Sequence, residues 1–177
     1  MAPDVFFLLF LPFAEAVEKT KTGDAQGWYA LAIHYAKGEE VDLDVSKARQ
    51  FMQKASDMNY SNAVFVVAML LDADSATAKD CGGLGRDSST TPPINQYLGG
   101  THFRVWNSPT TLSVTNEVDV AKIRAGYERA INLGVLVATN ELARFNRRVE
   151  AARAQIRKDA DEARQKAENA KLAEGLL

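Results

Sequence analysis

An internal repeat is the feature of this sequence that most restricts its fold. Residues 23–35 (GDAQGWYALAIHY) align with residues 59–71 (NYSNAVFVVAMLL) at an offset of 36. Residues 44–59 (DVSKARQFMQKASDMN) align with residues 119–134 (DVAKIRAGYERAINLG) at an offset of 75, which exceeds one 36-residue unit by 39 residues. A repeat of this length is typical of stacked helix pairs, because one pair alone cannot bury its apolar faces.

The extra residues fall within a segment of different composition, residues 73–118. Gly, Ser, Thr and Pro supply 20 of its 46 residues, which favours loops or short strands over continued helix. The β-branched and aromatic residues on either side of Asn107-Ser108-Pro109 predict a small hairpin. This segment is therefore predicted to be a long loop or hairpin insertion between helical repeats.

Each repeat is predicted to form two helices. In the first helix, small and aliphatic residues recur at positions i, i+4 and i+5, which lets neighbouring helices approach closely. The second helix carries its own apolar face, and a residue that tolerates a left-handed conformation follows it. Asp44 and Asp119 stand where a carboxylate stabilises the start of that second helix. The first strip is Gly27, Leu31 and Ala32 with Ala63, Val67, Ala68, Ala138, Leu142 and Ala143; the second face is Ala48, Phe51, Met52 and Ala55 with Ile123, Tyr127 and Ala130; the stop residues are Asn59 and Gly134.

The first repeat resembles the Sel-one-like repeat family, a branch of the tetratricopeptide-like helical repeats. Residues 23–72 and 119–145 carry the resemblance, with departures at Gly27, Gly126 and Glu40. The resemblance implies an all-α superhelix, or solenoid, of helix-turn-helix repeats that serves as a protein-interaction scaffold. The matching residues are Gly23, Asp24, Ala25, Tyr29, Leu31, Tyr35, Gly38, Val41, Asp44, Lys47, Ala48, Lys54 and Ala55.

The implied scaffold would contact another protein or a peptide through the first helix of each pair. Candidate contact residues are those that lie off the apolar strip of that helix. A face that is merely solvated, or that covers the insertion, is the alternative, because few residues dominate the binding energy of most interfaces. The candidates are Gln26, Ile33, Lys37, Asn62 and Met69.

The insertion concentrates four further candidates, Tyr97, His102, Phe103 and Trp106. Aromatic side chains are favoured anchors at protein interfaces. These residues are therefore candidates for binding a protein, a peptide or a sugar. They equally suit a structural role in which they hold the insertion against the helices, and both interpretations stay open.

The sequence predicts no catalytic residue, no metal site and no cofactor. Cys81 and His102 lie 21 residues apart, and a thiolate nucleophile would need a His base within hydrogen-bond reach. No HExxH, GxSxG or paired CxxC motif occurs, and a single Cys with two His residues leaves little for a zinc site. His34 is expected to be structural or exposed. A non-catalytic scaffold or adaptor is predicted, and the alternative is a ligand-binding or thiol-dependent module centred on residues 73–118.

Charge and the N-terminal residues limit the cellular context. The 21 Lys and Arg against 23 Asp and Glu give a net charge of −2, which argues against nucleic-acid binding. The apolar run at residues 5–13 (VFFLLFLPF) is too short to span a membrane. With Ala14-Glu15-Ala16 it resembles a secretory signal over residues 1–16, although no Lys or Arg precedes it. An apolar N-terminal helix in a cytoplasmic protein is the alternative to export.

The last segment, residues 146–177, follows the repeat domain of residues 17–145. Its 14 charged and 8 alanine residues among 32 predict a long helix. A thin apolar seam along it suits either a dimerisation arm or a helix that caps the stack. The cap is the favoured interpretation, with a monomer, because alanine side chains bury little apolar area. The seam residues are Val149, Ala152, Ile156, Ala163 and Ala170.

Overall fold

The computed structural model describes residues 11–38, 40–75 and 116–174, and every regular element within them is an α-helix. The helices are α1 (Phe13–Lys21), α2 (Ala25–Lys37), α3 (Val45–Asp57), α4 (Ser61–Ser75), α6 (Glu117–Asn132) and α7 (Val137–Glu174). The predicted all-α class is confirmed for this part of the chain. Because α4 continues to Ser75 and α6 begins at Glu117, both helices extend into the predicted insertion, and its boundaries at 73 and 118 were wrong by a few residues.

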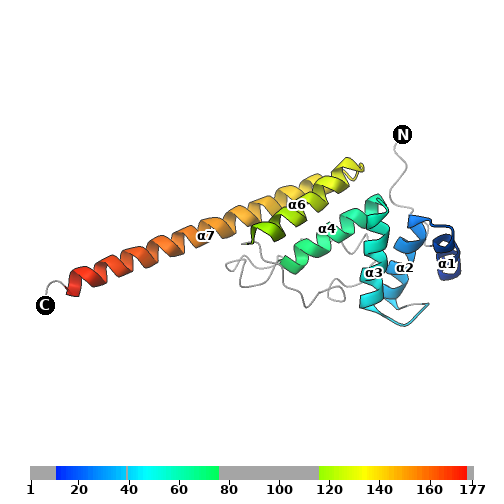
Figure 1. Ribbon diagram of the computed structural model, residues 1–177, viewed down its shortest axis with the longest axis horizontal. Coiled ribbons are helices and arrows are strands. Elements are labelled where there is room, and N and C mark those ends of the chain that lie inside the picture. The colour runs from blue at the N-terminus through cyan, green and yellow to red at the C-terminus, as the bar shows by residue number, and fades with distance from the viewer. Residues whose placement is uncertain (1–10, 39, 76–115, 175–177) are drawn as a thin grey trace.

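Each helix packs mainly on the helices that precede and follow it. The pairs in contact are α1 with α2, α2 with α3, α3 with α4, α4 with α6, and α6 with α7. Figure 1 shows these helices following one another from α1 at one end to α7 at the other. Helices α4 and α6 are therefore direct neighbours, although residues 76–116 separate them in the sequence.

The same turn follows α1, α3 and α6. Gly23, Asn59 and Gly134 occupy equivalent repeat positions and have φ angles of 77°, 62° and 86°, so the predicted left-handed stops at 59 and 134 are confirmed. The residue after each of them donates its N–H to the carbonyl five residues earlier, at 3.0 Å in all three turns. This bond is the defining contact of the Schellman motif, which ends a helix and redirects the chain.

Side-chain caps begin three of the helices. Asp44 accepts from the backbone N–H of Lys47 at the start of α3, and Asp119 lies in the first turn of α6, as predicted. Asp24 caps α2 by accepting from the N–H of Gln26 at 2.8 Å. The cap of α6 is Asn116, whose Oδ1 accepts from the Val118 N–H at 2.9 Å. These caps satisfy N–H groups that have no partner within their own helix.

Acid is expected to destabilise the protein partly through Asp24. The Lys19 side chain and then the Gln26 N–H donate to Asp24 and hold the pKa of its carboxyl below the ordinary value of 3.8. Because the folded-state pKa is depressed, this stabilisation is present above the unfolded-state value and is lost as the pH falls through the folded-state value. We expect Asp24→Asn to be less stable than wild type at about pH 7 and to lose less stability between about pH 5 and 2.

Urea unfolding across this pH range measures the effect of Asp24→Asn. The matched control is Glu128→Gln, which removes a carboxylate that is exposed on α6. Equal losses of stability on acidification in Asp24→Asn and in wild type would contradict the expectation.

The core consists of two hydrophobic clusters, and the larger one, which extends from α2 to α7, includes three neighbouring aromatic rings. Tyr127 of α6 lies between Phe65 of α4 and Phe145 of α7, with both pairs of ring centroids 6.3 Å apart. Ala143 is exposed, although it was predicted to lie on the apolar strip, because no helix among the described residues packs on that side of α7. The predicted second-helix positions Ala48, Met52, Ala55, Ile123, Tyr127 and Ala130 are all buried.

Gly27 and Gly126 lie at close helix contacts. A Cβ added at Gly27 of α2 would stand 2.8 Å from the Ala16 carbonyl oxygen and 2.8 Å from the Thr20 nitrogen, both backbone atoms of α1. A Cβ at Gly126 of α6 would stand 3.0 Å from the Cβ of Ala68 on α4. The absence of a side chain at Gly27 therefore allows the backbones of α1 and α2 to approach closely.

Candidate interaction surfaces

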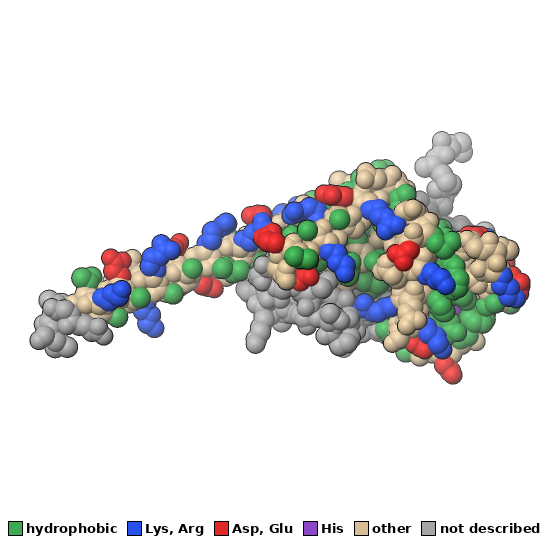
Figure 2. Space-filling view, in the orientation of Figure 1, with side chains coloured by type: hydrophobic (Ala, Val, Ile, Leu, Met, Phe, Trp, Pro, Cys, Tyr) green, Lys and Arg blue, Asp and Glu red, His purple; other side chains and the backbone are tan. Residues whose placement is uncertain are grey.

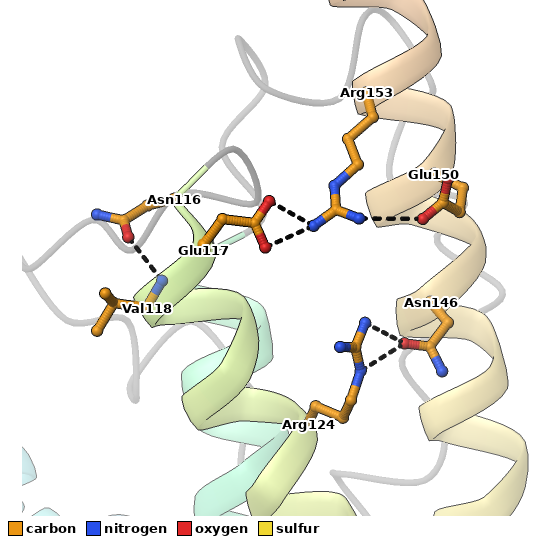
Figure 3. A network of polar contacts seen from close by, with 7 residues as sticks. All are labelled: Asn116, Glu117, Val118, Arg124, Asn146, Glu150 and Arg153. Carbon is orange, nitrogen blue, oxygen red and sulfur yellow. Dashed lines mark hydrogen bonds and ion pairs between the residues drawn. The ribbon is translucent and has the colours of Figure 1, made fainter.

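Helices α6 and α7 form the last interface of the stack, which Figure 3 shows from close by. Arg124 of α6 donates from Nε and Nη2 to Asn146 Oδ1, at 3.2 and 3.1 Å. Arg153 of α7 donates to both carboxylate oxygens of Glu117, at 2.6 and 2.7 Å. Residues 117 and 124 thus face residues 153 and 146, as they do in an antiparallel pair. Because Glu117 is the first residue of α6, Arg153 marks the end of this interface.

A polar cluster joins α4, α6 and α7 beside the aromatic core. The Tyr127 hydroxyl donates to Asp72 Oδ2 at 2.8 Å, and Arg148 donates to the other carboxylate oxygen of Asp72. Burial raises the pKa of Tyr127 and lowers that of Arg148. The tyrosine hydroxyl therefore keeps its proton and acts as the hydrogen-bond donor to the Asp72 carboxylate. This arrangement of two donors on one carboxylate is a structural tie between three helices.

Beyond Arg153, α7 has no helical neighbour within the described part of the chain. Every side chain from Ala154 to Ala173 is exposed, and Figures 1 and 2 show this half of α7 projecting past the other helices. We call residues 154–173 the arm. Its internal ion pairs, Lys158 with Glu162 and Asp161 with Arg164, both have N–O distances of 3.7 Å and are widely exposed.

The predicted seam of α7 divides where the arm begins. Val149 is fully buried and Ala152 partly buried against the stack, whereas Ile156 is 49% exposed and Ala163 and Ala170 are exposed. The first half of α7 therefore packs as the end helix of the stack. The second half is helical as far as Glu174 and extends beyond the stack.

A second surface feature is a row of partly buried rings at the opposite end, where α1, α2 and α3 meet. We call Phe13, Tyr35, Phe51 and Trp28 the aromatic row. Consecutive ring centroids along it are 6.2, 5.5 and 5.5 Å apart. Lys47 and Lys54 stand over two of the rings, with Nζ 5.1 Å from the Tyr35 centroid and 3.8 Å from the Trp28 centroid. Figure 2 shows hydrophobic side chains gathered at this end.

His34 is a structural residue on the inner side of that end. It is 2% exposed, and its Nε2 lies 2.7 Å from the Leu11 carbonyl oxygen, to which it donates. The Phe13 ring meets its ring edge-on at 5.6 Å, and the Phe13 N–H donates to Glu40 at 3.2 Å. These contacts hold residues 11–13 against α2 and the turn that follows it, and residues 1–10 lie outside the described residues.

The structure places the predicted contact residues in three groups. Ile33 and Met69 are 8% and 9% exposed and belong to the core, so their predicted place on an open surface was wrong. The physical reason is that α2 and α4 each lie between two helices, and a helix in that position buries more than one strip. Gln26, Lys37 and Asn62 are partly buried, with Gln26 Oε1 accepting from Lys19 Nζ at 2.9 Å. Tyr97, His102, Phe103, Trp106 and Cys81 lie outside the described residues.

The contacts that sequence reasoning missed join residues from different helices. Arg153 with Glu117 and Asp72 with Tyr127 depend on how two helices are aligned along each other, which no local pattern reports. The aromatic row depends on three helices at once. Only the arm had a recognisable pattern in the sequence, because the residues of the predicted seam follow helical spacing.

No known family model, curated protein or solved structure matches this chain significantly. Among residues 11–38, 40–75 and 116–174, no group of three His, Cys, Asp or Glu side chains could hold a metal ion. No helix in these same ranges is long and apolar enough to cross a bilayer.

Proposed function

We propose that this protein is a non-catalytic interaction scaffold or adaptor built on Sel-one-like helix pairs, and that another protein docks on its arm. The exposure of the arm is the observation that carries the proposal. Most helical stability in proteins comes from packing an apolar face on other elements, yet this helix runs from Ala154 to Ala173 with every side chain exposed. An exposed helix that carries an apolar seam is typical of partner-binding helices.

The repeat domain supports the same function. Schellman turns recur at equivalent positions after α1, α3 and α6, and each helix packs mainly on its neighbours in the chain. Both features are expected of a right-handed solenoid of helix pairs. Such stacks leave an extended surface, and proteins use that surface to bind other proteins.

A chain that ends at Arg153 is expected to fold as the full chain does. Because residues 154–173 are exposed, their removal is expected to change the free energy of unfolding by less than about 1 kcal/mol. Urea unfolding followed by tryptophan fluorescence measures this change.

The same truncation tests the proposed function in the cells that make the protein. Lysine cross-linking of the full chain should join a partner to Lys158, Lys166 or Lys171, and truncation at Arg153 should release that partner. Gln165→Ala, which changes a side chain on the opposite side of the arm from Ala163, is the matched control and should keep the partner. A truncated chain that retains the same cross-linked partner would contradict the proposal.

A further inference from the structure

The interface of α6 and α7 shows how α7 holds a neighbouring helix. Phe145 and Val149 are fully buried in its apolar face. Arg153 lies at one edge of that face and donates to both oxygens of Glu117. The interface therefore combines an apolar line along α7 with a basic edge residue that binds a carboxylate of the facing helix.

Both features continue into the arm. Ile156, Ala163 and Ala170 lie 11, 18 and 25 residues after Phe145, close to whole turns of a helix with 3.6 residues per turn, so they extend the apolar face. Arg157, Arg164 and Lys171 lie 4, 11 and 18 residues after Arg153 and extend its edge by the same spacing.

These edge side chains are available to a partner. All three are exposed, and Arg164, whose side chain is 80% exposed, pairs with Asp161 at a long N–O distance of 3.7 Å. Exposed pairs of this kind contribute little to stability, so they compete weakly with a carboxylate from another chain.

We infer that the arm binds an amphipathic helix of another protein that carries carboxylates along the edge facing Arg157, Arg164 and Lys171. The bound helix lies in line with α6 and continues the interface that ends at Arg153 and Glu117. This inference rests on the proposed function and adds the chemistry of the partner to it.

A second copy of this chain fits the arm less well. If two arms paired antiparallel, their two-fold axis would place each basic edge beside the basic edge of the other copy, and like charges so placed oppose binding. If two arms paired in parallel, the first half of α7 in one copy would overlap the α6 that packs on α7 in the other copy. Repulsion between like charges and steric overlap thus disfavour a second copy and favour an acidic helix from another protein.

Three synthetic helical peptides with the same alanine and leucine face test the inference against the full-length protein. Their edges carry Glu, Lys or Gln at seven-residue spacing, and binding is followed by fluorescence anisotropy. We expect the Glu peptide to bind at least about tenfold more tightly than the Lys peptide, and this advantage to shrink as salt is raised. The triple variant Arg157→Glu, Arg164→Glu, Lys171→Glu should reverse the preference.

The matched control is the triple variant Lys122→Glu, Arg147→Glu, Lys158→Glu, which changes the net charge equally at exposed residues off this edge. It should keep the preference for the Glu peptide. Circular dichroism and the unfolding midpoint should be unchanged in both variants, because all six side chains are exposed.

Three results would overturn the inference. Equal binding of the three peptides would remove the role of the basic edge while leaving the proposed docking function in place. If the Glu peptide bound the two triple variants equally, or bound neither of them, its binding site would lie elsewhere on the protein. A doubling of the 19.4 kDa mass in analytical ultracentrifugation that requires the arm would make a second copy the occupant.

Discussion

Tyr127→Ala is expected to lower the free energy of unfolding by about 3–5 kcal/mol. Tyr127 is 1% exposed and lies between the rings of Phe65 and Phe145, so its removal leaves a cavity that α4, α6 and α7 share. Such pairs of rings add stability beyond the area that they bury. Because domains of this size are stable by only about 5–15 kcal/mol, the variant should unfold at a much lower urea concentration, as followed by circular dichroism.

Tyr127→Phe is the control that separates the ring from its hydroxyl. It keeps both ring contacts and removes only the hydrogen bond to Asp72, which Arg148 still contacts. A loss of about 1–2 kcal/mol is expected, since a charged acceptor makes this bond stronger than an ordinary one. If Tyr127→Ala lost no more stability than Tyr127→Phe, the ring would not be central to the core.

Gly27→Ala is expected to lower the free energy of unfolding by about 2 kcal/mol, although alanine is the better helix former. The new Cβ would meet the Ala16 carbonyl oxygen and the Thr20 nitrogen, each at 2.8 Å, and backbone atoms cannot turn aside as a side chain can. The helices α1 and α2 would have to separate. Urea unfolding measures the loss, and hydrogen exchange should show reduced protection in α1.

Gly126→Ala is the matched control, because it makes the same change within another helix. Its Cβ would meet the Ala68 Cβ at 3.0 Å and no backbone atom of another helix closer than 3.5 Å. The higher helix propensity of alanine offsets this milder contact, so a change within about 1 kcal/mol is expected. Equal losses in the two variants would show that close backbone approach is not what Gly27 provides.

The turns that end α3 and α6 were predictable because they are encoded locally. A left-handed residue must stand where each Schellman motif ends a helix, and Asn59 and Gly134 meet that need without reference to the rest of the chain. The burial of Ile33 and Met69 was not predictable in the same way. It depends on how many helices surround α2 and α4, which the pattern within one helix does not report.

Of the candidate site on α7, only the apolar seam was predictable from the sequence. Its spacing along α7 follows from the sequence, but the boundary between its buried and exposed halves depends on where α6 begins. The partner of Arg153 is the first residue of α6, 36 positions earlier in the chain, and only the alignment of the two helices brings them together.

The direct packing of α4 on α6 bridges a long interval in the sequence. The 40 residues from 76 to 115 join these two helices, which contact each other directly. Chain-closure entropy rises only with the logarithm of length, so doubling such a connection costs about 0.6 kcal/mol. The entropy of chain closure alone therefore leaves the length of this segment free to change while α4 still packs on α6.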